Sequence, residues 1–399
     1  MKRVAFVHPS ATLYGSDRVL LDHLLCLDRS RYEARVYLPA TGPLTTCLSE
    51  AGISWELADV VGLTRPERTP SGLWRGLRAA REWPARLEAA EVDLVHTSTL
   101  ACVGGALGAR WLGLPHLWHV QEIPPPWGQR ALAPLLRGVG GARVANSQAV
   151  ASWLGGQGLE AEVIHPGRRA SPVREPRASL RSSLGIPAGA CCALLLGRLS
   201  PRKGQLLALE ALEAAASPDL WLVIAGDEAP GHPGYRQALR ARIGRSPRWG
   251  QVRLIPGRGD PWSLLSASDV VLVPSRAPES FGLVALEALL AARPVLASQG
   301  GGLPEVVGDA GQLLSPDPQA WAEAWLRLAG DPGLRAERAG EGLTRAAGFS
   351  PERSSAAIAE AYERLCEVPF GRAGGATAGG GTAPDANTPN CRFPLVFLR

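Results

Sequence analysis

The stretch that decides the fold reads Asp269-Val-Val-Leu-Val-Pro-Ser-Arg-Ala-Pro-Glu-Ser-Phe-Gly-Leu-Val-Ala-Leu-Glu287. It opens on a short apolar run, rich in β-branched residues and bounded by polar ones, which is typical of a buried strand. After Gly282, apolar residues at 283, 284, 286, 289 and 290 recur at the spacing of a helix that buries one face. The segment therefore predicts a strand, a loop that carries Glu279, and a helix that carries Glu287.

Glu279 and Glu287 are expected to lie where an α/β protein binds its ligand. Open α/β sheets bind ligands at the carboxyl ends of their strands, and the free N–H groups at the start of a helix can hold an anion. Ionised carboxylates can accept hydrogen bonds from neighbouring hydroxyls of a sugar or a ribose. Taken alone, such a pair more often has no ligand-binding role, with one glutamate solvated on a loop and the other on the surface of a helix.

A second strand-loop-helix segment carries two cations. Residues 191–196 form an apolar run suited to a buried parallel strand, Gly197 ends it, and a helical pattern follows. Arg198 and Lys203 lie in the loop between them, and the only other lysine of the chain is Lys2. Arginine offers a phosphate a planar fork, and lysine offers it a compact charge. A solvated basic turn is the alternative, but two such motifs on equivalent loops favour a pocket for a sugar nucleotide.

These segments, in this order and spacing, resemble the family-4 retaining glycosyltransferases (glycosyl transferases group 1). The resemblance covers about residues 1–365, and its motifs lie at 197–205, 222–227, 279–287 and 301–307. It implies an α/β protein of the GT-B fold, in which two Rossmann-like, doubly wound parallel-sheet domains face a central cleft. It further implies that a hexosyl-type sugar moves, with retention, from a nucleoside-diphosphate sugar to a hydroxyl of a glycan, a glycolipid or a small molecule.

Length and the order of elements agree with two domains. A chain of 399 residues supports two sizeable cores, and short strands that alternate with helices imply parallel sheets with right-handed crossovers. The glycine-rich C-terminal tail cannot bury enough apolar surface to become ordered. We expect an N-terminal acceptor-side domain at 1–168, a linker at 169–186, a donor-binding domain at 187–348, a helix at 349–368 that in the family crosses back to the first domain, and a disordered tail at 369–399.

The first domain is expected to contribute to the donor site through two loops. Gly15 follows the first strand, so that backbone N–H groups can approach a phosphate closely, and Ser16 is the expected cap of the next helix. The resemblance assigns this loop to the distal phosphate of the donor. It also places His119, at the end of a strand, beside the transferred sugar, although a strand histidine is more often structural. His96 is expected to be structural, and the turn Asn146-Ser147 to be a helix N-cap.

The resulting site hypothesis assigns a role to each residue type. Glu279 holds hydroxyls of the transferred sugar and Glu287 those of the ribose, while the leaving phosphate itself takes the proton of the acceptor. Arg198, Lys203 and a helix N-terminus neutralise the diphosphate, so we expect no metal ion and no cofactor besides the donor substrate. The expected catalytic residues are His119, Arg198, Lys203 and Glu279. The expected donor-binding residues are Gly15, Ser16, Arg198, Lys203, Gly257, Ser280, Phe281, Gly282, Leu283 and Glu287.

Composition limits the partners and the compartment. The net charge of +5 is small for this length, and no nucleic-acid-binding motif is present. Seven cysteines without a C-x-x-C pair favour the reducing cytoplasm, with Cys191 and Cys192 buried. The apolar part of the first eight residues is too short for a signal peptide, and without a run of about 18 apolar residues we expect no membrane-spanning helix. Arginines between Arg65 and Arg86 could touch anionic lipid headgroups at the inner face of a membrane. Trp127 could line the acceptor entrance. For the arginines the more common explanation is a solvated helix face, and for Trp127 it is a tryptophan packed in a proline-rich loop.

Two other classes of protein share the expected fold. A sugar-nucleotide epimerase or a phosphorylase would need a different set of active-site residues. A noncatalytic nucleotide-sugar-binding protein would be indicated by the loss of a motif residue, and none is lost here. The sequence assigns neither the donor base and sugar nor the acceptor.

Overall fold

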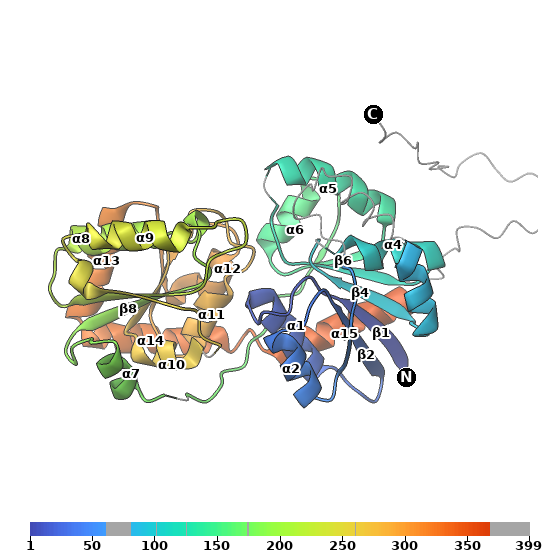
Figure 1. Ribbon diagram of the computed structural model, residues 1–399, viewed down its shortest axis with the longest axis horizontal. Helices are drawn as coiled ribbons and strands as arrows, with labels where there is room; N and C mark the ends of the chain where they lie inside the picture. The colour runs from blue at the N-terminus through green and yellow to red at the C-terminus, as the bar shows by residue number, and fades with distance from the viewer. Residues whose placement is uncertain (61–80, 101, 125, 174, 260, 368–399) are drawn as a thin grey trace, which may run out of the picture.

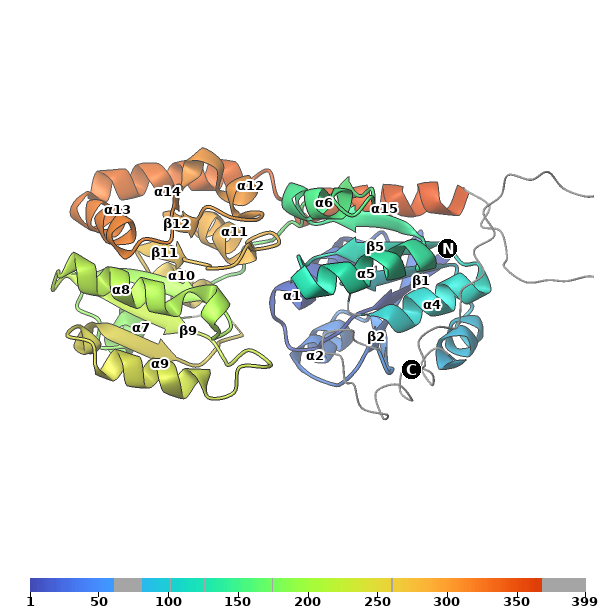
Figure 2. The same ribbon diagram turned by 90° about the horizontal axis from the view of Figure 1, so that it is seen from above.

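The computed structural model describes residues 1–60, 81–100, 102–124, 126–173, 175–259 and 261–367. They form two parallel β-sheets, each covered by helices on both faces, and the two units lie next to each other (Figure 1). The view from above shows α15 leaving the second unit to lie along the first (Figure 2). This is the predicted GT-B architecture of two facing α/β domains. The predicted tail and most of the 65–86 segment lie outside the described residues.

The first sheet contains, among the described residues, seven strands in the order β3-β2-β1-β4-β5-β6-β7. Every neighbouring pair is parallel. The short strands β3 and β7 were not predicted. The strands are β1 (Lys2–Val7), β2 (Tyr32–Leu38), β3 (Ser54–Leu57), β4 (Leu94–Ser98), β5 (His116–Val120), β6 (Ala142–Ala145) and β7 (Glu162–Val163). The helices around this sheet include α1 (Gly15–Cys26), α2 (Pro43–Glu50), α4 (Val103–Leu112), α5 (Pro126–Val139) and α6 (Gln148–Gly155).

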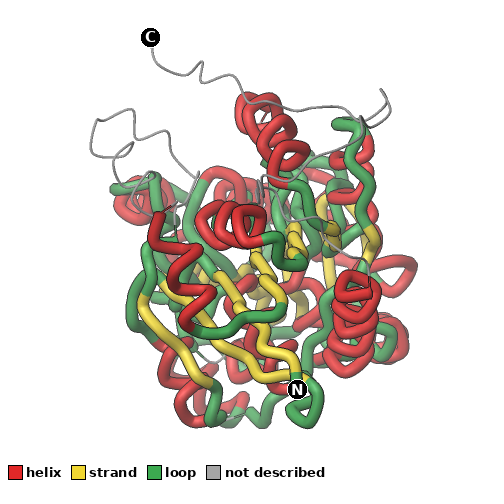
Figure 3. Tube along the Cα trace, turned by 90° about the vertical axis from the view of Figure 1, so that its right-hand side faces the viewer, coloured by secondary structure: helices red, strands yellow, loops and turns green. Residues whose placement is uncertain are grey.

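The second sheet contains six parallel strands in the order β10-β9-β8-β11-β12-β13 within the described part of the chain. Its strands are β8 (Cys191–Leu196), β9 (Leu220–Ala225), β10 (Val252–Ile255), β11 (Val270–Val273), β12 (Val295–Ser298) and β13 (Gln312–Leu314). Its helices are α7 (Arg177–Ser183), α8 (Gln205–Ala215), α9 (Tyr235–Gly244), α10 (Pro261–Ala267), α11 (Leu283–Leu290), α12 (Leu303–Val307), α13 (Pro318–Gly330) and α14 (Pro332–Ala346). Figure 3 shows strands enclosed by helices.

The central strand β8 explains why its sequence is uniformly apolar. Cys192 and Leu194 belong to the core on one face of the sheet, and Cys191 and Leu195 to the core on the other. A parallel strand that is covered on both faces has no polar side. Burial raises the pKa of the Cys191 thiol to about 11 and that of Cys192 to about 12. Both thiols are therefore protonated at neutral pH, and the prediction that they are buried is confirmed.

The range predicted as a linker contains a helix that was not anticipated. Helix α7 occupies Arg177–Ser183 and packs against α10, with Leu180 fully buried in the core of the second domain. Within the predicted linker, the described residues on either side of this helix, 169–173, 175–176 and 184–186, form neither helix nor strand. The arginines of this segment suggested a solvated linker. In the structure Arg177 and Arg181 both pair with Asp269, directly before β11, and so attach α7 to the second domain.

The last described helix, α15 (Pro351–Glu367), packs on the first domain against α1. Its fully buried Tyr362 places its hydroxyl 2.5 Å from His96 Nδ1 and 3.2 Å from His23 Nε2. The expectation that His96 is structural is thereby met, because this histidine anchors the helix. None of the described helices combines the length and the apolar character that crossing a membrane requires.

Buried histidines predict that the protein loses stability in mild acid. Burial lowers the pKa of His23 and His116 to about 3 and that of His119 to about 4, and it also lowers the pKa of His96. The unfolded chain takes up these protons below about pH 6.5 and the folded chain does not, so stability falls as the pH drops from 6.5 toward 4. His23, His116 and His119 each contribute about 2 kcal/mol of this loss at pH 5.

Urea denaturation at pH 7 and pH 5 measures this effect. We expect His116→Gln to reduce by about one the number of protons taken up on unfolding at pH 5. A free energy of unfolding that is equal at the two pH values would contradict the expectation.

Candidate functional site

The site gathers at the carboxyl ends of the strands of the second sheet. The loop after β8 contains a single 3-10 turn, Pro201–Lys203, and Gly204 then adopts φ 70°. A Cβ on Gly204 would lie 1.8 Å from the carbonyl oxygen of Pro274, so only glycine lets this loop pack against the end of β11. The close packing brings the cationic loop after β8 beside the acidic loop after β11.

Lys203 and Glu279 form an ion pair between these two loops. Lys203 Nζ donates to Glu279 Oε1 at 2.7 Å, and the Ser275 hydroxyl donates to the same oxygen. Burial acts to raise the pKa of Glu279, but the charge and hydrogen bond of Lys203 outweigh it and hold the pKa below its usual value. Glu279 is therefore ionised at neutral pH and can accept hydrogen bonds from substrate hydroxyls.

Two glycines shape the loop that carries Glu279. Gly301, at φ 63°, forms a parallel bridge with Glu279, and the N–H of Gly302 donates to the Glu279 carbonyl at 2.8 Å. Gly282, at φ 111°, is the N-cap of α11, and a Cβ there would lie 2.6 Å from Leu303 Cδ2. The first N–H groups of α11 follow Gly282 directly, where a phosphate would meet the positive end of the helix dipole.

Arg198 lies exposed in the same loop as Lys203 and contacts the first domain. Its guanidinium carbon is 5.8 Å from the centre of the Tyr14 ring. The Tyr14 hydroxyl donates to Asp227 Oδ2 at 3.1 Å, and the N–H of Gly257 donates to Asp227 Oδ1 at 3.1 Å. Burial, and then the charge of Asp227, raises the pKa of Tyr14, so the phenol stays protonated as a donor. Tyr14 thus joins the loop after β1 to the loops after β8, β9 and β10.

Glu287 is buried inside α11, and it is not the helix-surface residue that the alternative explanation assumed. Only 4% of its side chain is exposed, and its Oε1 accepts hydrogen bonds from Arg18 of α1 and Arg168 of the interdomain segment. The expected ribose-binding carboxylate therefore lies where the two domains meet.

The loop after β1 faces the start of α11, as the site hypothesis requires. Gly15 is the first residue of α1, and a Cβ on it would lie 3.6 Å from Leu283 Cδ2. Ser16 is not the helix cap: Tyr14 occupies that position, and Ser16 is the second residue of the helix. The carboxylate of Asp17 satisfies the N–H groups of Thr12 and Tyr14 instead, at 3.2 and 3.0 Å. The same carboxylate also pairs with buried His8, and these contacts fix Asp17 at the start of α1.

Besides Glu287, two more expected site residues have buried side chains. His119 is 3% exposed, and its Nε2 has no hydrogen-bond partner among the described residues. Since burial, and secondarily His8, lowers its pKa to about 4, it is a neutral imidazole that can donate or accept a hydrogen bond. The Phe281 ring packs against His165 and Phe349, so only the backbone of this residue can face a donor. Ser147, by contrast, is the predicted N-cap of α6 and accepts from Val150 N at 3.1 Å.

The sequence analysis missed several contacts that join the domains. Arg18 and Tyr14 flank the Gly15 loop that was singled out, and Arg168 stands at the predicted end of the first domain, where no role was assigned to it. Glu305 of α12 accepts from the N–H groups of Gln148 and Ala149, at 2.6 and 2.8 Å, and so caps α6 of the other domain. The sequence pointed to Glu305 only through the 301–307 motif, in which it stands. Its partners in the first domain lie more than 100 residues away, and contacts over such a distance leave no local sequence pattern.

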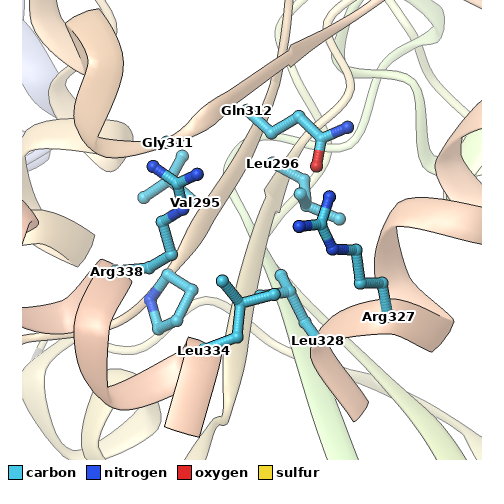
Figure 4. Close-up of a pocket in the computed structure, with 9 residues that line it drawn as sticks. Val295, Leu296, Gly311, Gln312, Arg327, Leu328, Leu334 and Arg338 are labelled. Atoms are coloured by element: carbon cyan, nitrogen blue, oxygen red, sulfur yellow. The ribbon is translucent and has the colours of Figure 1, made fainter. Parts of the chain in front are cut away.

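A separate small pocket lies at the other end of the second sheet. It is lined by Pro294, Val295, Leu296, Gly311, Gln312, Arg327, Leu328, Leu334 and Arg338 (Figure 4). These residues stand at the amino ends of β12 and β13 and on α13 and α14, and none belongs to the candidate site. Within the described ranges, no three His, Cys, Asp or Glu side chains are arranged to hold a metal ion. The side chain of Trp127 lies outside the described residues.

Comparison with known proteins gives matches over the same segments. Residues 176–342 match the family described as glycosyl transferases group 1. A D-inositol 3-phosphate glycosyltransferase of Kineococcus radiotolerans is 33% identical over 210 residues, 48% of this chain and 48% of that protein. A protein of the same name from Streptomyces bingchenggensis is 30% identical over 305 residues, 68% of this chain and 66% of that protein. The chain spans about half the length of most of these relatives.

The fold is similar to that of HepE from Anabaena. The HepE structure in complex with UDP and glucose has a TM-score of 0.79 and 27% sequence identity, and it covers 91% of this chain and 100% of that chain. The HepE complex with UDP-glucose has a TM-score of 0.78 over the same shares.

Proposed function

Because residues 176–342 of this chain form a group 1 glycosyltransferase domain within a GT-B fold, we propose that the protein transfers a hexosyl-type sugar from a nucleoside-diphosphate sugar to a hydroxyl. The acceptor is a glycan, a glycolipid or a small molecule, and the reaction retains the anomeric configuration. Contact with a membrane through residues 65–86 stays a prediction, since most of that segment lies outside the described residues.

The observation that carries the proposal is the ion pair of Lys203 with Glu279, beside the start of α11. A sugar nucleotide needs a cation for its diphosphate and an acceptor for its sugar hydroxyls within one sugar length of each other. The pair supplies both, with Nζ and Oε1 only 2.7 Å apart. Leu283, four residues after Glu279, faces the Gly15 loop of the first domain, where a Cβ on Gly15 would lie 3.6 Å from Leu283 Cδ2, and we assign the diphosphate to this junction of the two domains.

The roles of the residues follow from their charges. Lys203 and Arg198 oppose the negative charge that develops on the leaving phosphate, and preorganised charge of this kind is usually the largest catalytic term. Glu279 orients the sugar by accepting from its hydroxyls, and neutral His119 orients it from the first domain. The acceptor hydroxyl attacks the face that the phosphate leaves, and the phosphate takes its proton. We propose that the reaction needs no metal ion, because two cations and a helix N-terminus already meet the diphosphate.

The donor base is proposed to be uracil. The support is HepE, which was solved with UDP and with UDP-glucose and is 27% identical over 91% of this chain. In this chain we assign the base to the loop at Gly257, whose N–H donates to Asp227 Oδ1.

Release of nucleoside diphosphate tests the function. The protein is incubated in EDTA with UDP-glucose, GDP-mannose or ADP-glucose. The release of UDP, GDP or ADP is followed with and without a mixture of glycan and glycoside acceptors. We expect UDP to be released from the uridine donor. We also expect NMR to show that the product has the same anomeric configuration as the donor. Binding of UDP without any release would favour the noncatalytic alternative, and an inverted product would refute retention.

A further inference from the structure

Glu287 has one engaged carboxylate oxygen and one free oxygen. Its Oε1 lies 3.1 Å from Arg18 Nη1, 3.2 Å from Arg168 Nε and 3.1 Å from Arg168 Nη2. Among the described residues nothing hydrogen-bonds to Oε2. Two arginines therefore hold the carboxylate in one orientation and leave its second oxygen available to a hydroxyl.

Arg18 is itself fixed at every branch of its guanidinium. Nε donates to the carbonyl of Leu13 at 2.8 Å, and Nη2 donates to the carbonyl of Gly259 at 3.1 Å, while Nη1 binds Glu287. Leu13 adopts φ 63°, a strained conformation for a residue with a side chain, and such strain concentrates at functional sites. The side chain of Arg18 is only 15% exposed. A flexible side chain is thus held between the loop before α1 in its own domain and two parts of the other domain, the loop at Gly259 and helix α11.

The two arginines that bind Glu287 come from different parts of the molecule. Arg168 belongs to the segment between the domains, and it also pairs with Asp22 of α1. Arg18 lies on the first turn of α1 in the first domain. If the domains moved apart, Arg18 would leave with α1 and Glu287 would lose one of its two fixed partners, together with the link to Gly259.

We propose that Arg18 is a positioning residue: it holds Glu287 in the orientation that binds the donor ribose, and so makes recognition of the ribose depend on the approach of the two domains. This inference rests on the proposed function. Arg18 does not touch the donor in this account. Its effect reaches the nucleotide only through Oε2 of Glu287 and the 2′- and 3′-hydroxyls.

A binding cycle isolates this path. Calorimetry gives the dissociation constants of UDP and of 2′,3′-dideoxy-UDP for the wild type, Arg18→Ala and Glu287→Gln. Hydrogen bonds to a charged carboxylate lead us to expect about 10- to 100-fold tighter binding of UDP than of the dideoxy compound by the wild type. In Arg18→Ala this ratio is expected to fall nearly to one, as in Glu287→Gln, while the affinity for dideoxy-UDP is almost unchanged. Arg110→Ala, an exposed arginine on α4, is the control that keeps the wild-type ratio.

Each other result overturns the inference in its own way. Equal weakening of both ligands by Arg18→Ala would mean that Arg18 contacts the diphosphate or the base directly. Tighter binding would mean that Arg18 obstructs the site. An unchanged ratio would mean that Arg168 alone orients Glu287. If the wild type bound none of UDP, GDP and ADP, the proposed function itself would be refuted. Wild-type binding thus tests the function, and the ratio in Arg18→Ala tests the role of Arg18.

Discussion

Replacing Lys203 by alanine is expected to lower turnover by about 10²–10³-fold, the cost of removing one preorganised donor to a developing charge. Lys203 Nζ is the cation closest to the sugar-binding carboxylate, at 2.7 Å from Glu279 Oε1. Its loss leaves Glu279 without the charge that holds its pKa down, so both the diphosphate and the sugar are held less well. Initial rates of UDP release at saturating donor measure the effect.

Controls separate chemistry from folding in this experiment. Lys2→Ala changes the only other lysine, on the first strand, and is expected to keep full activity. Because only 28% of the Lys203 side chain and 18% of that of Glu279 are exposed, removing Lys203 leaves a mostly buried carboxylate without its partner and should cost about 3 kcal/mol of stability; a thermal melt measures this cost, and the rates are compared at a temperature at which the variant is folded. Lys203→Arg retains the charge in another shape and is expected to recover part of the rate. Wild-type turnover in Lys203→Ala would remove this residue from the mechanism.

Replacing Gly301 by alanine is expected to reduce the free energy of unfolding by about 2–5 kcal/mol, since it combines a left-handed backbone with overpacking. Gly301 has φ 63°, and a Cβ there would lie 1.9 Å from the Glu279 carbonyl oxygen and 2.7 Å from its nitrogen. The backbone of Glu279 must shift to make room, so the ion pair with Lys203 is also displaced. Any folded variant should therefore lose most of its activity.

Gly52 provides the matched control for Gly301. It has φ 65°, and a Cβ there would meet no atom within 4 Å. Gly52→Ala consequently reports the backbone penalty alone, about 1 kcal/mol, with full activity. Urea denaturation of both variants yields the difference. If the two substitutions proved equally mild, the close approach of Gly301 to the Glu279 loop would not be needed.

The sequence predicted the features that depend on local pattern. The uniformly apolar runs at 191–196 and 270–273 gave the central strands, because a doubly covered parallel strand cannot alternate. The motif loops that follow them, with Lys203 and Glu279, could be paired because equivalent loops of a parallel sheet meet at one edge. Short strands such as β7, with two residues, have too few positions to show a period.

The contacts between the domains could not be read in the same way. Arg18 lies 269 residues from Glu287, and Tyr14 lies 213 residues from Asp227. No periodicity links such partners, and a lone arginine on a helix reads as a solvated residue. Two further features also depend on tertiary packing: the Phe281 ring packs into the core, and Asp17 accepts from the backbone before α1, while Ser16 is not the expected helix cap. These are effects of tertiary packing on residues whose local sequence permits either outcome.

Thermal unfolding of the wild type with UDP in EDTA shows whether the protein has a metal-independent nucleotide site. At about 100 times its dissociation constant, a ligand that binds only the folded protein adds about 2.7 kcal/mol. We expect UDP to raise the melting temperature in EDTA, and we expect this rise to be largely lost in Lys203→Ala and kept in Lys2→Ala. A melting temperature that no nucleoside diphosphate changes, or a rise that Lys203→Ala leaves intact, would contradict a sugar-nucleotide site built on Lys203 and Glu279.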